Sequence, residues 1–196
     1  MDAISTTQTL QAPGPGSVFE YEHWYTFASA PPEGPDSSSD SVIGRGLAID
    51  GKTDVLADDS KVAGSSSVSW ISYEANGDIS WYAASPGASG DWERFPLSSK
   101  DTVIFVKGKN SLGNLVVDTN SFLGAKDTTI EGLLWHAIKI RQIVSLDGHI
   151  YNNEVLWFDS VTGWYLRMDM PPRVPFEPGL STNGEEVHVY NYKIEP

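Results

Sequence analysis

Apolar and polar residues alternate along much of the chain, in short runs that glycine, proline, asparagine and aspartate separate. A period of two is the pattern of a β-strand with one buried face. Such runs lie at 19–27, 42–49, 68–73, 79–83, 102–107, 115–118 and 187–194. The pattern predicts roughly eight to ten strands and an all-β fold, an antiparallel β-sandwich or barrel with hairpin and meander connections.

The segment 138–168 predicts a three-stranded meander whose pairing can be worked out. Asp147-Gly148 is a favoured two-residue hairpin turn, and it would place Ile140 opposite Val155. A second turn over 160–163 would bring the third strand back along the second. This region therefore makes the most specific structural prediction in the chain.

In this register one face of the meander would be apolar around Trp157, and the other charged, with Arg141 opposite Glu154. Because side chains alternate between the two faces of a strand, a slip by one residue would exchange the faces. The apolar face would hold Ile138, Ile140, Val144, Tyr151, Val155, Trp157, Leu166 and Met168.

A second hairpin is predicted around Asn76-Gly77, which is a strong signal for a two-residue turn. Such a turn would pair Tyr73 with Ser80 and Ile71 with Tyr82. The flanking runs are rich in aromatic and β-branched residues, as strands are.

Four segments depart from the strand pattern. Apolar residues at helical spacing predict at most one short helix near 129–138. Residues 31–41, rich in proline and serine, predict a surface loop, and the prolines of 171–178 predict an extended segment outside any ladder. Residues 1–18 predict an extended N-terminal arm, which leaves 19–196 as a single β-rich domain.

Composition excludes several classes of function. The 196 residues carry a formal charge of −13 and no cysteine. Excess acid disfavours direct nucleic-acid binding and an anionic membrane surface, because both need basic residues. Without cysteine there are no disulfides, thiolate metal sites or cysteine nucleophiles. The N-terminal residues lack the basic and apolar regions of a classical secretion signal.

No catalytic or metal motif emerges from residue spacing. The four histidines do not stand at metal-ligand spacings. Asp91 and Glu93 could act as paired carboxylates in glycoside hydrolysis, which keeps a glycoside-active enzyme as a third alternative. A structural calcium ion in the acidic segment 50–59 also stays open. We expect no enzyme, no catalytic residues, no cofactor and no metal.

The seven tryptophans are the most suggestive residues for binding. Exposed aromatic rings anchor protein interfaces and stack on sugars. Trp92 follows a glycine-rich loop and is the best candidate for a contact residue, with Trp24 second. A carbohydrate-binding β-sandwich module using Trp70, Trp81 and Trp92, with a glycan ligand, is the main alternative function.

The motif Val155-Leu156-Trp157-Phe158-Asp159-Ser160-Val161-Thr162-Gly163-Trp164-Tyr165-Leu166-Arg167, after Asp147-Gly148, resembles β-meanders in small structural proteins of tailed bacteriophages. The resemblance covers about 30 residues. It implies a non-enzymatic virion subunit, such as a capsid decoration, collar or tail component, and a location in the virion. It carries over no catalytic residues.

We therefore expect an assembly protein that binds other copies or subunits, as a homo-oligomer, through its arm and loops. The virion would assemble in the host cytoplasm, and the alternative is a soluble cytoplasmic protein. The candidate contact residues are Pro13, Pro15, Phe19, Trp24, Trp92, Pro172, Pro175 and Phe176.

Overall fold

The computed structural model describes residues 9–27, 30–62, 64–83, 92–172 and 183–196. Within these residues the chain forms twelve strands and no helix, which confirms the prediction of an all-β fold. The strands are β1 (Val18–Thr26), β2 (Glu33–Ile49), β3 (Lys52–Val62), β4 (Ser65–Tyr73), β5 (Ile79–Ala83), β6 (Glu93–Phe95), β7 (Thr102–Lys109), β8 (Leu115–Ile130), β9 (Leu133–Leu146), β10 (His149–Asp159), β11 (Tyr165–Met170) and β12 (Gly184–Lys193).

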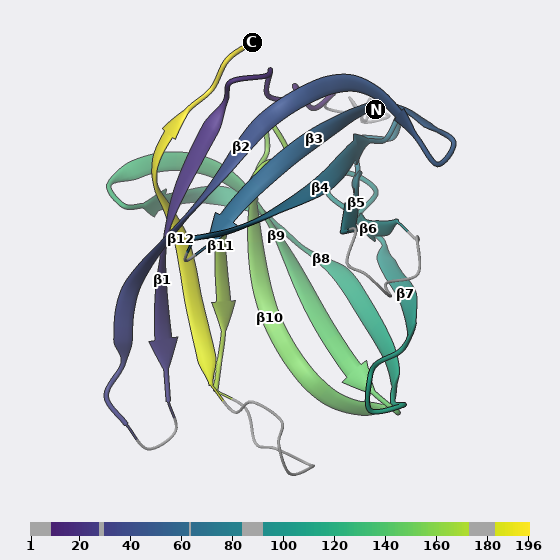
Figure 1. The fold of residues 1–196 in the computed structure, drawn as a ribbon, viewed down its shortest axis with the longest axis vertical. Coiled ribbons are helices and arrows are strands. Elements are labelled where there is room, and N and C mark those ends of the chain that lie inside the picture. The colour runs from purple at the N-terminus through teal and green to yellow at the C-terminus, as the bar shows by residue number, and fades with distance from the viewer. Residues whose placement is uncertain (1–8, 28–29, 63, 84–91, 173–182) are drawn as a thin grey trace, which may run out of the picture.

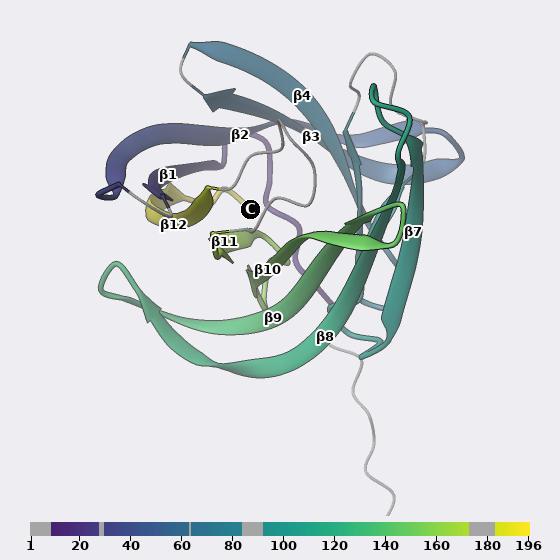
Figure 2. The same ribbon diagram turned by 90° about the horizontal axis from the view of Figure 1, so that it is seen from below.

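All twelve strands belong to one antiparallel sheet, in the order β6-β5-β4-β3-β2-β1-β12-β11-β10-β9-β8-β7. The sheet is two meanders joined where the first strand pairs with the last. It curls into a nearly closed barrel, as the view in Figure 2 shows. Its two end strands, β6 and β7, come close together in Figure 1 and contact each other without a ladder between them.

The meander predicted over 138–168 forms, but its register differs by one residue. A β-bulge between Ile150 and Asn152 shifts the register by one residue, so Ile140 lies opposite Leu156 instead of Val155. Bulges insert one residue into one strand and shift everything beyond them. Turn chemistry at Asp147-Gly148 does not reveal this extra residue.

The shift exchanges the faces of β10. Glu154 turns inward, with only 6% of its surface exposed, and lies opposite Gln142 instead of Arg141. Trp157 turns outward, where Lys139 lies 4.5 Å and Arg167 5.2 Å from its ring centroid. These two cations cover the indole, which is therefore buried although it is outside the barrel.

The hairpin around Asn76-Gly77 also forms one residue out of the predicted register, with Ile71 opposite Trp81. Its loop is longer than two residues, because the amide of Glu74 donates to the carbonyl of Asp78 at 2.9 Å. Asp78 holds this loop: Arg94 Nε and the amide of Ser98 donate to its carboxylate at 2.8 and 2.9 Å.

Two further predictions are wrong. Residues 129–138 contain a hairpin turn and no helix, since Glu131 and Gly132 both have positive φ and link β8 directly to β9. Residues 33–41 are part of β2 instead of a surface loop. Proline is tolerated there because β3 pairs with β2 only from Ser38 onward, so Pro35 is not required to donate on that side.

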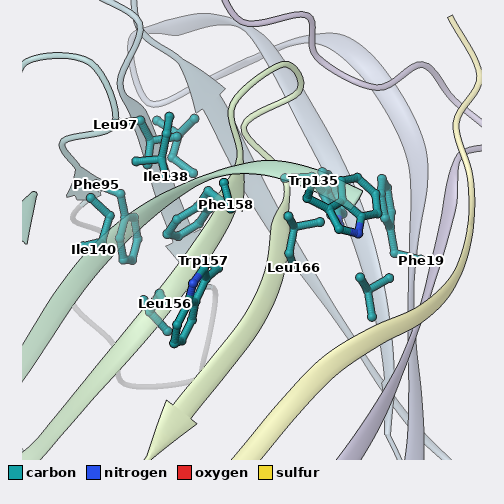
Figure 3. Close-up of a cluster of buried hydrophobic side chains, with 14 of the residues drawn as sticks. Phe19, Phe95, Leu97, Trp135, Ile138, Ile140, Leu156, Trp157, Phe158 and Leu166 are labelled. Carbon is teal, nitrogen blue, oxygen red and sulfur yellow. The ribbon is translucent and has the colours of Figure 1, made fainter. Parts of the chain in front are cut away.

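The apolar core fills one end of the barrel (Figure 3). Phe95 and Phe158 approach to 5.5 Å between centroids, and Ile138, Ile140 and Leu156 lie on the neighbouring strands. Burial of such side chains is the main favourable term for folding, at about 25 cal/mol per Å² of apolar surface.

Residues 9–17, part of the arm predicted at 1–18, lie against the chain's own barrel. The amide of Gln11 donates to Val161 at 2.7 Å, and that of Gly14 donates to Glu195 at 2.7 Å. Leu10 packs against the core. The arm therefore closes over one end of the barrel from residue 9 onward.

Candidate functional site

The inner face of the barrel changes from apolar to polar along its strands. On β9 the inward residues run from Ile138 and Ile140 to Gln142, and on β10 from Leu156 to Glu154. Polar side chains inside a barrel cost free energy unless partners satisfy them. This half of the lumen is thus built for polar contacts and not for packing alone.

A cavity of about 360 Å³ occupies this part of the lumen, within the range of small-molecule sites. Apolar walls come from Trp81, Phe95, Leu156, Met168 and Val187. Four carboxyl groups line it, against one lysine and one histidine: Asp40, Glu93, Glu154 and Glu185, with Lys107 and His23. The lumen cavity is therefore acidic.

One side of the cavity is the seam where the sheet ends meet. Lys107 on β7 lies 3.1 Å from Glu93 on β6 and 2.5 Å from Asp118 on β8. Asn120 and Gln142 also donate to Glu93, at 3.1 and 2.5 Å. Side chains thus join strands that no backbone ladder connects.

Burial and charge attraction both shift the pKa values of the ionisable groups in the seam. Burial raises the pKa of Asp118 to about 6, even though the adjacent Lys107 ammonium acts in the opposite direction. The pKa of Lys107 is raised, because the attraction of Glu93 and Asp118 outweighs its own burial. Both groups therefore depend on each other for their charge.

The opposite side of the cavity carries His23 and the half-buried Asp40, and the buried Asp58 lies beside Asp40. His23 Nδ1 lies 2.8 Å from Glu185, and its Nε2 lies 2.6 Å from the Ser38 hydroxyl. Asp40 on β2 and Asp58 on β3 are inward neighbours, since Asp40 lies opposite Ser60 and Asp58 two residues before it.

Burial, and for Asp58 the nearby Asp40, raise the pKa values of both aspartates, that of Asp58 to about 8. Hydrogen bonding from Ser60 and Tyr21 opposes the rise in the pKa of Asp40, and the hydroxyl of Ser69 lies 3.4 Å from Asp58. In the described part of the chain, neither aspartate forms an ion pair with a cation.

The contact residues expected from the sequence lie away from this cavity. Pro13 is buried against the barrel end, whereas Pro15 and Pro172 are exposed. Phe19 is fully buried and stacks on Trp164 at 4.5 Å, so it belongs to the core. Pro175 and Phe176 lie outside the described residues.

Of the tryptophans proposed as contacts, Trp24 is 36% exposed on β1. Trp92 is half-buried between Tyr82, at 5.4 Å, and Lys52, at 5.2 Å from its ring centroid. Their role in contacts stays a prediction.

The three tryptophans of the sugar-binding alternative do not share a face. Trp70 and Trp92 both contact Tyr82 on the outer face, while Trp81 contacts Phe95 inside the barrel and lines the cavity. They therefore do not form one platform.

The acidic residues that the sequence suggested as paired carboxylates or as calcium ligands also lie in different parts of the molecule. Glu93 belongs to the seam, and Asp91 lies outside the described residues. Asp54 faces Arg45 at 3.7 Å, whereas Asp58 points into the lumen. Among the described residues no three acidic or histidine side chains come together as metal ligands.

Sequence reasoning missed the residues that line the lumen. Asp40, Asp58 and Glu154 were assigned to a loop, an acidic cluster and a charged outer face, and Gln142 was assigned to neither face of the meander. Polar residues at every second position of a strand are the signal that could have found them, but only in the correct register.

No helix in the described ranges has the length and apolar character needed to cross a membrane. No protein-family model matches the sequence, and no curated protein matches it either.

Solved structures resemble the fold. One is described as "a putative lipoprotein from Parabacteroides distasonis", with a TM-score of 0.54 and 9% identity over 98% of this chain and 100% of that one. Another is described as "a putative exported protein with YmcC-like fold" from Bacteroides fragilis, with a TM-score of 0.52 and 9% identity over 95% of this chain and 99% of that one. At this identity the likeness concerns the fold.

These structures correct two predictions. The expected phage virion subunit and its location in a virion are wrong, because proteins that share the whole fold are described as a lipoprotein and an exported protein. The earlier resemblance rested on one meander of generic hairpin residues, whereas the structural match spans nearly the entire chain. The chain is similar in fold to YmcC-like proteins.

Proposed function

We propose that this chain is a non-catalytic binding protein that holds one small molecule in the lumen of its barrel. The observation that carries the proposal is the cavity of about 360 Å³ with four inward carboxyl groups among apolar walls. Barrels of moderate size can hold one small ligand inside, and their mouths are preferred binding sites.

The distribution of polar groups supports binding over packing. A lumen built only for stability would continue the apolar inner face of Ile138, Ile140 and Leu156 to both ends. Instead the strands place Gln142 and Glu154 inward at the cavity, where burying them opposes folding. Buried polar groups that oppose folding are expected where they bind a ligand.

Ligand binding in the lumen is tested by filling the cavity with a larger side chain. A thermal-shift screen of a small-molecule library identifies ligands, and Val187→Phe then adds a ring at a buried cavity wall. We expect hits to lose their shift in Val187→Phe and keep it in Ile104→Phe, a surface control that is 68% exposed on β7. Hits that stabilise both variants equally would contradict lumen binding.

We also propose that the protein works outside the cytoplasm. The support is the shared fold with an exported protein and a lipoprotein. Fractionation of the native cell, followed by detection with an antibody against this chain, tests the location. Recovery only with the cytosolic proteins would overturn it.

A further inference from the structure

A second, much smaller cavity adjoins the lumen. Its volume is about 10 Å³, which is close to the space of one water-sized group. It lies between Asp40 and Asp58, and it shares Asp40, Trp81 and Tyr165 with the lumen cavity. The two cavities are therefore adjacent, with these three side chains at their boundary.

One buried carboxylate oxygen in the wall of the small cavity has no hydrogen-bond donor beside it. Asp58 is 1% exposed, and its Oδ1 atom has no hydrogen-bond partner among the described residues. Leaving a buried acceptor unsatisfied costs about 1–3 kcal/mol, and more if it is charged. A ligand that brings N–H donors to this place removes that cost.

The surroundings select among possible ligand groups. Anions are repelled by the four lining carboxyl groups. A metal ion would need more ligands than two aspartates, and no third acidic or histidine side chain joins them in the described ranges. An ammonium group has three donors, and the rings of Trp81 and Tyr165 favour a nearby cation.

We infer that the lumen binds a small organic cation whose primary ammonium group enters the space between Asp40 and Asp58. Its apolar remainder lies in the lumen cavity against Trp81, Leu156 and Met168. The inference rests on the proposed function and names the ligand class of that same site.

Binding is expected to depend on pH, because the ammonium group pairs with the ionised carboxylate. The raised pKa of Asp58 means that the empty site holds a proton, which ligand binding releases. Affinity then rises up to about tenfold per pH unit as pH increases towards about 8.

Other groups around the pair could contribute to this dependence. Among the titratable neighbours, His23 carries an imidazole whose charge also acts on Asp40. A His23→Gln variant therefore separates the two contributions. The titratable groups facing the two aspartates from the surrounding strands are Tyr21 and His23 on β1, Tyr73 on β4 and Tyr165 on β11. Asp59, on the other face of β3, has a smaller influence on Asp58.

The probes are four compounds with one phenylethyl frame: 2-phenylethylamine, its N,N,N-trimethyl derivative, 2-phenylethanol and 3-phenylpropionate. Isothermal titration calorimetry measures their affinities for the full chain. We expect the amine to bind at least tenfold tighter than the other three. Trimethylation removes all N–H donors and makes the head too large for the small cavity, which separates specific pairing from general attraction.

Variants locate the ammonium group. Asp58→Asn and Asp40→Asn are expected to weaken amine binding at least tenfold, and Asp58→Asn to abolish its proton release. Asp59→Asn is the matched control on the same strand, since Asp59 pairs with Lys61 at 3.4 Å. Its affinity for the amine is expected to stay unchanged.

The outcomes separate the ligand class from the function itself. Equal binding of the alcohol or the trimethyl compound, or unchanged binding by Asp58→Asn, overturns the ammonium inference and leaves lumen binding standing. A second outcome is that none of the four compounds binds, while library hits still lose their thermal shift in Val187→Phe. That result overturns the ammonium inference and leaves lumen binding standing. If no library hit depends on the lumen, both fall.

Discussion

At the scale of single residues, the molecule places carboxyl groups where burial opposes their charge. Asp58 is the clearest case, because its pKa of about 8 lies far above the ordinary 3.8. Its sequence neighbours suggest a solvated acidic cluster, and composition alone could not distinguish that from a lumen residue. The face of β3 on which an aspartate lies decides whether it is a solvated surface group or a lumen residue.

The pKa of Asp58 has a consequence for stability. Between the unfolded value near 3.8 and about 8, the folded protein binds this proton more tightly than the unfolded chain does. The contribution of Asp58 to the free energy of unfolding therefore falls by up to about 1.4 kcal/mol per pH unit across that window as pH rises.

Asp58→Asn should remove this dependence. Chemical denaturation at pH 5 and pH 8.5 is expected to show that the stability of the variant, relative to wild type, rises by up to about 4 kcal/mol between the two pH values. Asp59→Asn serves as the control and should follow wild type. A parallel pH profile for Asp58→Asn and wild type would mean that Asp58 is ionised in the empty barrel.

At the scale of elements, alternation and turn signals predicted most strands but not their pairing. The runs at 138–146 and 149–159 are strands β9 and β10, as expected, yet a bulge at Tyr151 moves their register by one residue. The sequence could not show it, because a bulge depends on how the strand bends around the barrel. That single residue turns Glu154 into the barrel, so the register predicted from the sequence does not reveal the lumen site.

The register can be tested by cross-linking, since the chain has no cysteine of its own. Arg141→Cys with Val155→Cys places two thiols directly opposite each other, and a disulfide is expected to form under mild oxidation. Arg141→Cys with Glu154→Cys should not cross-link, because Glu154 points into the barrel. The reverse result would restore the register without the bulge.

At the scale of the whole molecule, the barrel depends on side chains to close. A sheet leaves unpaired edges at its two end strands unless it closes on itself or its edges are covered. Here β6 and β7 meet through Glu93, Lys107 and Asp118. The strand pattern predicted a sandwich or barrel, but alternation and turn signals do not show that two consecutive strands, β6 and β7, meet through side chains without a ladder.

Lys107→Met tests the seam. Loss of the ammonium group leaves Glu93 and Asp118 facing each other without a cation, with Asp118 fully buried. We expect a loss of about 2 kcal/mol in the free energy of unfolding, less than for a fully buried pair because 43% of the Lys107 side chain is exposed. Lys109→Met on the same strand is the control, and equal stabilities would exclude a role of Lys107 in closure.

Binding inside the lumen is the central claim, and one tryptophan reports on it. Of the seven, only Trp81 lines the lumen cavity, while Trp24 and Trp157 lie on the outer face. The most direct measurement is a nuclear magnetic resonance titration of the ¹⁵N-labelled protein with 2-phenylethylamine, following the indole N–H signals. Saturable movement of the Trp81 signal, with those of Trp24 and Trp157 unmoved, is the predicted result. An unmoved Trp81 signal, or shifts confined to the outer tryptophans, would contradict it.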